Sequence, residues 1–82
     1  MDNKLNTNSL TILVAALNEE DLIETSVKEI ITVTENILDK YEVILFNDGS
    51  KDETGLLMDQ MEIKNPRITV VHHAKPEGLG SL

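Results

Sequence analysis

The sequence predicts an α/β fold: a three-stranded parallel sheet with two helices, in the chain order β-α-β-α-β. Three short aliphatic, β-branched runs alternate with two stretches of helical periodicity. The first two runs are almost continuously apolar, which is typical of strands buried on both faces of a parallel sheet. Such an alternation favours right-handed crossovers between parallel strands, so the chain resembles half of a doubly wound sheet.

The first strand is predicted at residues 10–16, after a polar opening that contains Asn and Thr. We expect residues 1–9 to be a flexible tail and residues 10–82 to be one partial domain. A chain of 82 residues is small, and a domain of this size buries only about 60% of the surface that its unfolded form exposes.

The first helix is predicted from Glu19 to Leu38. Asn18 is a good N-cap residue, and the acidic residues 19–21 suit the positive end of the helix dipole. One apolar stripe at helical spacing follows, made of Leu22, Ile23, Val27, Ile30, Ile31, Ile37 and Leu38.

The second strand is predicted at Glu42–Asn47, and a second helix follows it. Ser50 and Glu53 fit a capping box, in which each side chain bonds a free backbone amide of the helix start. We expect this helix to end near Ile63, because Asn65-Pro66 breaks it, and a third strand to occupy Ile68–Val71 with its flanks.

If each strand is added on the same side of the last, both helices lie on one face of the sheet and the other stays bare. The first two strands nevertheless carry apolar residues at both parities: Ile12, Val14, Ile44 and Phe46 at one, and Leu13, Ala15, Val43 and Leu45 at the other. We therefore expect a second copy of the chain, or a further domain, to cover the bare face.

Charge and composition exclude several classes of function. The net charge of −8 repels nucleic acids, and it also disfavours a diphosphate unless a cation or a helix N-terminus offsets it. No cysteine is present, and the longest apolar run, residues 12–17, is too short to span a bilayer. The opening residues lack a signal-peptide pattern, so the sequence predicts a cytoplasmic chain.

Ligands of open parallel sheets bind beyond the carboxyl ends of the strands, here residues 17–20, 47–50 and 72–80. Asp48 follows a buried strand, and Gly49 permits a tight turn, so the carboxylate of Asp48 is expected to project into the crevice. It can accept a hydrogen bond from an imide N–H or a ribose hydroxyl. The alternative is that residues 47–50 form only a turn and a helix cap, for which these residue types are common.

Residues 13–20 (LVAALNEE) and 43–54 (VILFNDGSKDET) carry a family resemblance. They are similar to the pattern of family-two glycosyltransferases of the GT-A fold, in which a Pro-x-x-Asn-Glu segment is followed about thirty residues on by Asp-Asp-Gly-Ser-x-Asp. Residues 67–71 and 78–80 also resemble that family's third strand and glycine loop. The resemblance runs from Leu10 to Leu82. Within the family, the chain most resembles the dolichyl-phosphate and polyisoprenyl-phosphate sugar transferases.

The resemblance implies a nucleotide-binding role for five residues. Glu19 and Asp48 would hold the base and ribose of a UDP- or GDP-linked sugar, and Ala15, Leu17 and Phe46 would line the pocket. Ala15 replaces the family's usual proline, Asn47 its first aspartate, and Pro76 an asparagine of the glycine loop.

None of these residues is catalytic. The family's divalent cation, Mg or Mn, and its general base belong to motifs beyond Leu82, so no catalytic residue or metal ligand is assigned to this chain. The complete enzyme would transfer the sugar to a lipid-phosphate or polysaccharide acceptor, in cell-envelope polysaccharide biosynthesis, and the resemblance allows a place at the inner face of a membrane.

Weaker signals favour structural roles. His72 and His73 are adjacent, so on a strand they point to opposite faces and cannot share a metal ion. The acidic residues 19–21 suit a helix dipole, and Met58 and Met61 suit the core. Gly78 and Gly80 are interpreted as a turn rather than a phosphate loop.

The sequence argues against two rival interpretations and leaves a third open. A dinucleotide-binding domain requires a Gly-x-Gly-x-x-Gly turn, and residues 15–22 contain no glycine. A receiver-like phosphoacceptor domain would end its third strand in aspartate rather than histidine. The serious alternative is a non-catalytic remnant that acts as a nucleotide-binding or protein-interaction module.

Overall fold

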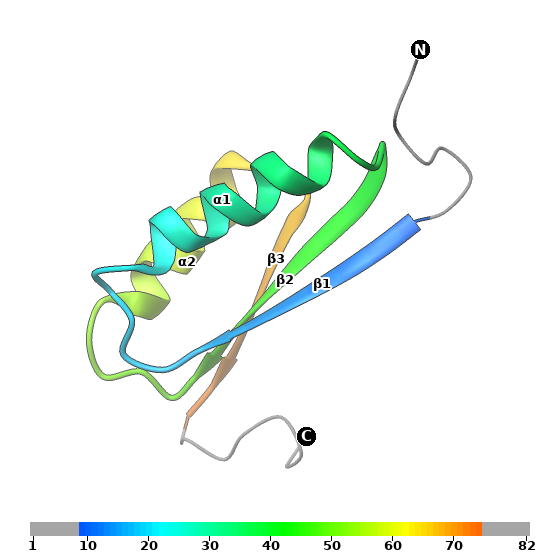
Figure 1. Cartoon of the computed structure of the whole chain (residues 1–82). Coiled ribbons are helices and arrows are strands. Elements are labelled where there is room, and N and C mark those ends of the chain that lie inside the picture. The colour runs from blue at the N-terminus through cyan, green and yellow to red at the C-terminus, as the bar shows by residue number, and fades with distance from the viewer. Residues whose placement is uncertain (1–8, 75–82) are drawn as a thin grey trace.

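The computed structural model describes residues 9–74, which form a three-stranded parallel sheet with two helices on one face (Figure 1). The elements are β1 (Ser9–Ala16), α1 (Ile23–Glu35), β2 (Lys40–Asp48), α2 (Thr54–Lys64) and β3 (Ile68–His73). The sheet order is β1-β2-β3, and both pairs are parallel. The predicted fold class is therefore confirmed. The rest of the predicted tail, Pro76 and the glycines 78 and 80 lie outside the described residues.

The core lies between the sheet and the helices. Its centre is β2, whose Val43 and Leu45 are completely buried, as expected for the apolar run of a middle strand. The buried cluster consists of Ala16, Ile23, Val27, Tyr41, Val43, Leu45, Met58 and Ile68. Met58 fills the core as predicted, and Met61 packs against it while only partly buried.

The strand register corrects the predicted grouping of side chains by parity. Ile12 pairs with Val43, and Leu13 pairs with Ile44. Even-numbered residues of β1 therefore share a face with odd-numbered residues of β2, because neighbours in register point the same way. Ile12 belongs with Val43 on the helix-covered face, and Leu13 belongs with Ile44 on the other.

The second face of the sheet is covered by neither helix, as predicted (Figure 1). Leu13 is 49% exposed and Val71 is 40% exposed there, and Ile44 is partly exposed. Phe46 differs, because it is 1% exposed and packs against the ring of His73. This surface is named the open face below, and what covers it in solution stays a prediction.

Helix α1 is shorter at both ends than predicted. It begins at Ile23 rather than Glu19 and ends at Glu35 rather than Leu38. Asn18 is not its cap: the N-cap is Leu22, and Asn18 has a left-handed backbone with φ of 52°, which does not continue into a helix. Residues 19–22 form a turn in which the backbone carbonyl of Glu19 accepts the amides of Leu22 and Ile23.

The predicted capping box before α2 is wrong. The N-cap of α2 is Glu53, and its side chain makes no capping hydrogen bond. The Ser50 hydroxyl instead accepts a hydrogen bond from the backbone amide of Asn18. The sequence has the local pattern of a capping box, but the serine bonds the loop after β1 instead.

No helix among residues 9–74 is long and apolar enough to cross a membrane. The longer of the two, α1, has 13 residues, whereas a spanning helix needs about 20 apolar residues.

Candidate functional site

The loops that follow β1 and β2 are joined at the carboxyl ends of the strands. Three consecutive backbone amides of the first loop donate to side chains of the second. The pairs are Asn18 N to Ser50 Oγ at 2.9 Å, Glu19 N to Thr54 Oγ1 at 2.8 Å and Glu20 N to Asp52 Oδ2 at 3.2 Å. The first loop therefore takes its shape from the second.

The second loop makes the reciprocal bonds. The side-chain oxygen of Asn18 accepts the backbone amide of Lys51 at 2.8 Å and that of Asp52 at 3.4 Å. A carboxylate oxygen of Glu20 accepts the backbone amide of Glu53 at 3.0 Å. The amide of Glu53 belongs to the N-cap of α2, so the first loop satisfies one of the amides at the start of that helix that have no helical partner.

Asp52 and Thr54 form the centre of this connection. Asp52 accepts both the backbone amide and the hydroxyl of Thr54, in addition to the amide of Glu20. Partial desolvation raises the pKa of the Asp52 carboxyl, but these hydrogen bonds outweigh it, so the pKa lies below its usual value. Asp52 is therefore an ionised acceptor that holds two loops together.

Residues 47–50 form the tight turn that the sequence predicts. The side-chain oxygen of Asn47 accepts the amide of Ser50 at 3.0 Å, and Gly49 has φ of 77°, a left-handed conformation that favours glycine. Turn chemistry thus accounts for Asn47, Gly49 and Ser50. Asp48, which is partly exposed, ends β2 immediately before this turn.

The structure brings three of the five predicted nucleotide-binding residues onto one face. Ala15 and Phe46 are register partners, and Asp48 comes two residues later on β2, so all three belong to the open face. Leu17 and Glu19 lie in the loop after β1, and Leu17 is 40% exposed.

Glu19 lies closer to α1 than the other predicted residues. With Ala15 and the start of α1 it lines a shallow hollow of about 160 Å³. Phe46 and Asp48 do not line this hollow, so the five residues do not share one enclosed pocket.

The adjacent histidines point to opposite faces, as predicted. On the helix-covered face, His72 contacts Asn47 and Asp59. On the open face, the ring of His73 lies 5.5 Å from that of Phe46, measured between centroids. His73 therefore lies on the same face as Phe46 and Asp48, although the sequence analysis assigned it no binding role.

This arrangement coincides with a family match. Residues 11–81 match the family described as Glycosyl transferase family 2. The chain belongs to this family. The match includes all five predicted nucleotide-binding residues and both joined loops. No curated protein matches the chain.

The residues that join the two loops of this family 2 chain were largely missed by sequence reasoning. Asn18 was interpreted as a helix cap, and Thr54 and Asp52 were assigned no role. Alternating hydroxyl and acid groups at positions 50, 52 and 54 are a faint signal. Their partners lie more than thirty residues away, so only the strand register reveals the pairing.

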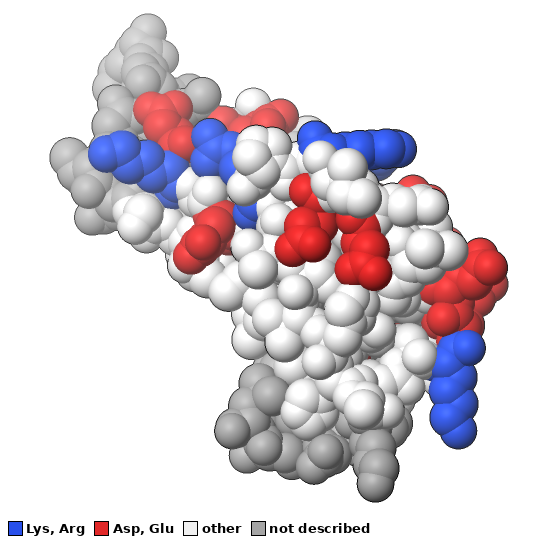
Figure 2. Space-filling model, turned by 180° about the vertical axis from the view of Figure 1, so that it is seen from behind, with Lys and Arg blue, Asp and Glu red and all other residues white. Residues whose placement is uncertain are grey.

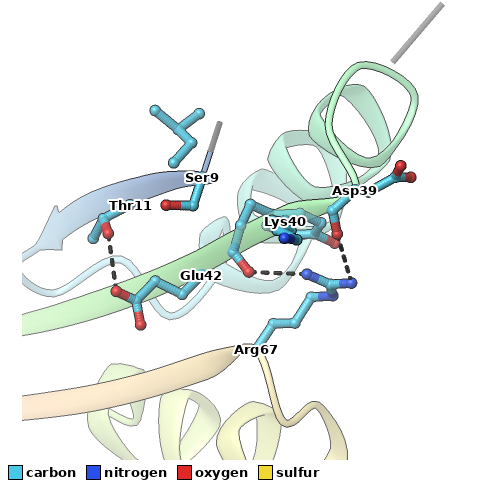
Figure 3. Close-up of a pocket in the computed structure, with 8 residues that line it drawn as sticks. Ser9, Thr11, Asp39, Lys40, Glu42 and Arg67 are labelled. Carbon is cyan, nitrogen blue, oxygen red and sulfur yellow. Dashed lines mark hydrogen bonds between the residues drawn. The ribbon is translucent and has the colours of Figure 1, made fainter. Parts of the chain in front are cut away.

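A second hollow lies at the opposite end of the sheet in this family 2 chain (Figure 3). It measures about 400 Å³ and is lined by Ser9, Leu10, Thr11, Asp39, Lys40, Tyr41, Glu42 and Arg67. The guanidinium of Arg67 donates to the carbonyls of Tyr41 and Asp39 at 2.9 and 3.1 Å and covers the Tyr41 ring at 4.2 Å. Its charge is therefore used to hold the edge of the sheet together.

Charge is unevenly distributed over the surface. Seen from behind, acidic side chains lie at the right-hand edge, in the middle and at the upper left, and a broad uncharged stretch occupies the lower centre (Figure 2). Among residues 9–74 no group of three or more acidic, histidine or cysteine side chains could hold a metal ion.

Proposed function

We propose that this family 2 chain binds the nucleoside diphosphate part of a UDP- or GDP-linked sugar at the carboxyl ends of β1 and β2. The observation that carries the proposal is the position of Asp48, which ends β2 directly before a turn that is hydrogen-bonded to the loop containing Glu19. Ligands of open parallel sheets bind beyond the carboxyl ends of the strands, which supports a binding role for a carboxylate at this position.

Asp48 and Glu19 supply the polar recognition. A carboxylate accepts a hydrogen bond from the imide N–H of uracil, from the ring N–H of guanine or from a ribose hydroxyl, and its charge strengthens that bond. Ala15, Leu17 and Phe46 supply an apolar wall, since base and sugar rings pack on such surfaces. The fixed backbone of the first loop reduces the ordering that binding requires.

We propose that the complete enzyme transfers the sugar to a lipid-phosphate or polysaccharide acceptor of the cell envelope. The resemblance at residues 13–20 and 43–54 supports the dolichyl-phosphate and polyisoprenyl-phosphate transferases as the subgroup, working at the inner face of a membrane. A magnesium or manganese ion would offset the diphosphate against the net charge of −8. Its ligands would come from outside residues 9–74.

A second candidate is an interaction module that transfers no sugar. The exposed Leu13 and Val71 of the open face favour it, because adjoining apolar side chains on a surface often mark a contact with another protein. This candidate predicts that the chain self-associates or binds a partner while nucleotide has no effect.

The test is calorimetric titration of the chain with UDP and with GDP. Asp48→Ala should weaken binding by about tenfold or more, since removing a charged hydrogen-bond partner costs about 1.5–3 kcal/mol. Asp39→Ala, at the opposite end of the sheet, is the matched control and should bind like the unaltered chain. Equal affinities for the chain and for Asp48→Ala would remove Asp48 from the site.

A further inference from the structure

A line of hydrogen bonds runs under α2 and reaches the proposed nucleotide site. Asp59 Oδ1 on α2 lies 2.8 Å from His72 Nε2, and His72 Nδ1 lies 2.9 Å from Asn47 Nδ2. Asn47 Oδ1 accepts the amide of Ser50, and the Ser50 hydroxyl accepts the amide of Asn18. The line therefore joins the tip of β3 to both loops at the site.

The donors and acceptors along this line admit one arrangement. The Ser50 amide can only donate, so the Asn47 atom facing it is the oxygen and the atom facing His72 is the NH₂ group. That group can only donate, so His72 Nδ1 must accept and carries no proton. The proton of the neutral ring then resides on Nε2 and is donated to the carboxylate of Asp59.

A second proton on His72 is incompatible with this arrangement. It would place N–H on Nδ1, directly opposite the NH₂ group of Asn47. Rotating the amide of Asn47 would not restore the line, because it would turn NH₂ toward the donating amide of Ser50. Protonation of His72 therefore breaks the bond to Asn47 or the bond that holds the turn.

Protonation of His72 weakens its contact with Asn47 and strengthens its contact with Asp59, and the burial of these residues shows which effect is larger. Asn47 is 7% exposed, so losing its partner leaves a buried polar group unpaired. The side chains of His72 and Asp59 are 45% and 48% exposed, and an ion pair at such a surface contributes little. Protonation therefore costs more at Asn47 than it regains at Asp59.

Among residues 9–74, the charged group in contact with His72 is Asp59, whose carboxylate favours a protonated ring. Asp59 faces it from α2, while Asn47 of β2 and Gly55 of α2 are uncharged neighbours. On β1 the neighbour in register is Ala16. His73 is adjacent in sequence but lies on the open face beside Phe46, so it does not take part in this line of hydrogen bonds.

We propose that His72 is a positioning residue for the turn at residues 47–50, and that its protonation loosens this turn and weakens nucleotide binding. The proposal rests on the proposed function, since the turn follows Asp48. A histidine gains its second proton between about pH 5 and 8. The site is then intact at neutral pH and weakened in acid.

The direct test is nitrogen-15 NMR of the His72 ring, together with hydrogen exchange of the Ser50 amide. At pH 7.5 Nδ1 should show the shift of an unprotonated nitrogen and Nε2 that of a protonated one. The protection factor of Ser50 should fall about fivefold or more between pH 7.5 and 5.5, the scale expected for a lost hydrogen bond. A proton on Nδ1 at pH 7.5, or an unchanged protection factor, would overturn the proposal.

A variant separates titration of His72 from other effects of acid. His72→Asn is expected to keep an acceptor where Nδ1 lies, because the side-chain oxygen of asparagine branches from the same carbon, but it cannot gain a proton. Its Ser50 protection should be independent of pH. His72→Leu, which lacks an acceptor, should show low protection at both pH values, and His73→Gln should behave like the unaltered chain.

Titration with UDP and GDP at both pH values then connects the turn to the site. Phosphate groups also titrate near pH 6, so the result is the difference between the unaltered chain and His72→Asn. We expect the unaltered chain to lose about fivefold more affinity in acid; equal losses would overturn the coupling to the site. If neither nucleotide binds at pH 7.5, the proposed function is wrong, and the NMR measurements alone decide the role of His72.

Discussion

The two ends of the sheet are held together in different ways. At the amino ends, the guanidinium of Arg67 donates to the carbonyls of Asp39 and Tyr41 and covers the Tyr41 ring. At the carboxyl ends, short side chains bond the backbone of the opposite loop, as Ser50 does for Asn18. The contacts of Arg67 are called the clamp below, and the hydrogen bonds between the two loops are called the distributed connection.

This difference bears on which end of the sheet can bind an anionic ligand. The clamp uses the cation of Arg67, which would otherwise be the natural partner of an anionic ligand in the hollow there. The distributed connection uses the backbone of Glu19. The hollow at the amino end is larger than the one beside Glu19, but our proposal places the nucleotide at the carboxyl end.

The largest expected effect lies at the carboxyl end. Thr54 is completely buried, accepts the amide of Glu19 and donates to Asp52. Thr54→Val keeps the shape of the side chain but leaves both partners without the hydroxyl, so we expect the free energy of unfolding to fall by about 2 kcal/mol. Urea denaturation measures it, and Thr54→Ser, which keeps the hydroxyl, should lose less. Equal losses for the two variants would contradict a role for the hydroxyl.

The amino end should be weakened somewhat less. Arg67→Leu removes two charged hydrogen bonds and the stacking on Tyr41, and because Arg67 is exposed we expect a loss of about 1–2 kcal/mol. Arg67→Lys should recover only part of it, since an ammonium group lacks the planar fork. Affinity for UDP and GDP, measured under conditions where the variant is folded, should not change; a large drop would mean that the ends are not independent.

Gly55 probes the contact between α2 and the turn. A Cβ atom added there would lie 2.6 Å from Asn47 Nδ2 and 3.3 Å from His72 Cε1. Such crowding costs about 1–3 kcal/mol, and the better helix propensity of alanine returns about 1 kcal/mol, so Gly55→Ala should destabilise by about 1 kcal/mol. Thermal unfolding measures this, with Gln60→Ala on the exposed side of α2 as the control. A stabilised Gly55→Ala would show that Asn47 is not held where the structure has it.

The smallest expected effect is a dependence on acid at Asp52. Its pKa is lowered in the folded state, so its contribution to stability is present above the unfolded value of about 3.9 and is lost as the pH falls through the folded value. Urea denaturation between pH 6 and 3 should therefore show a smaller acid-induced loss for Asp52→Asn than for the unaltered chain. Parallel curves would contradict the role of Asp52 as an ionised acceptor.

The fold followed from local patterns, except at the starts of α1 and α2, where the predicted caps are wrong. Apolar runs such as residues 43–46 predicted the strands, because burial on both faces leaves few other arrangements. The start of α1 was placed four residues early, since Asn18 has the chemistry of a cap but bonds the amides of Lys51 and Asp52 instead. A local rule cannot anticipate a competing partner from a distant segment.

The candidate site was predictable in outline only. Asp48 and Gly49 stood out because they follow a buried strand, and the turn at residues 47–50 has the expected shape. The contact between Asn47 and His72 was not predicted, because it depends on the register of β3 against β2. Sequence therefore located the strand tips, while the connections between them required the structure.

The most direct test of a nucleotide site at the carboxyl end is NMR mapping of backbone amides during titration with UDP and with GDP. We expect the largest shift changes at residues 17–20 and 47–50, with little change at residues 39–42 and at Arg67. Changes centred on the hollow beside Arg67, or no changes at a saturating nucleotide concentration, would contradict the account.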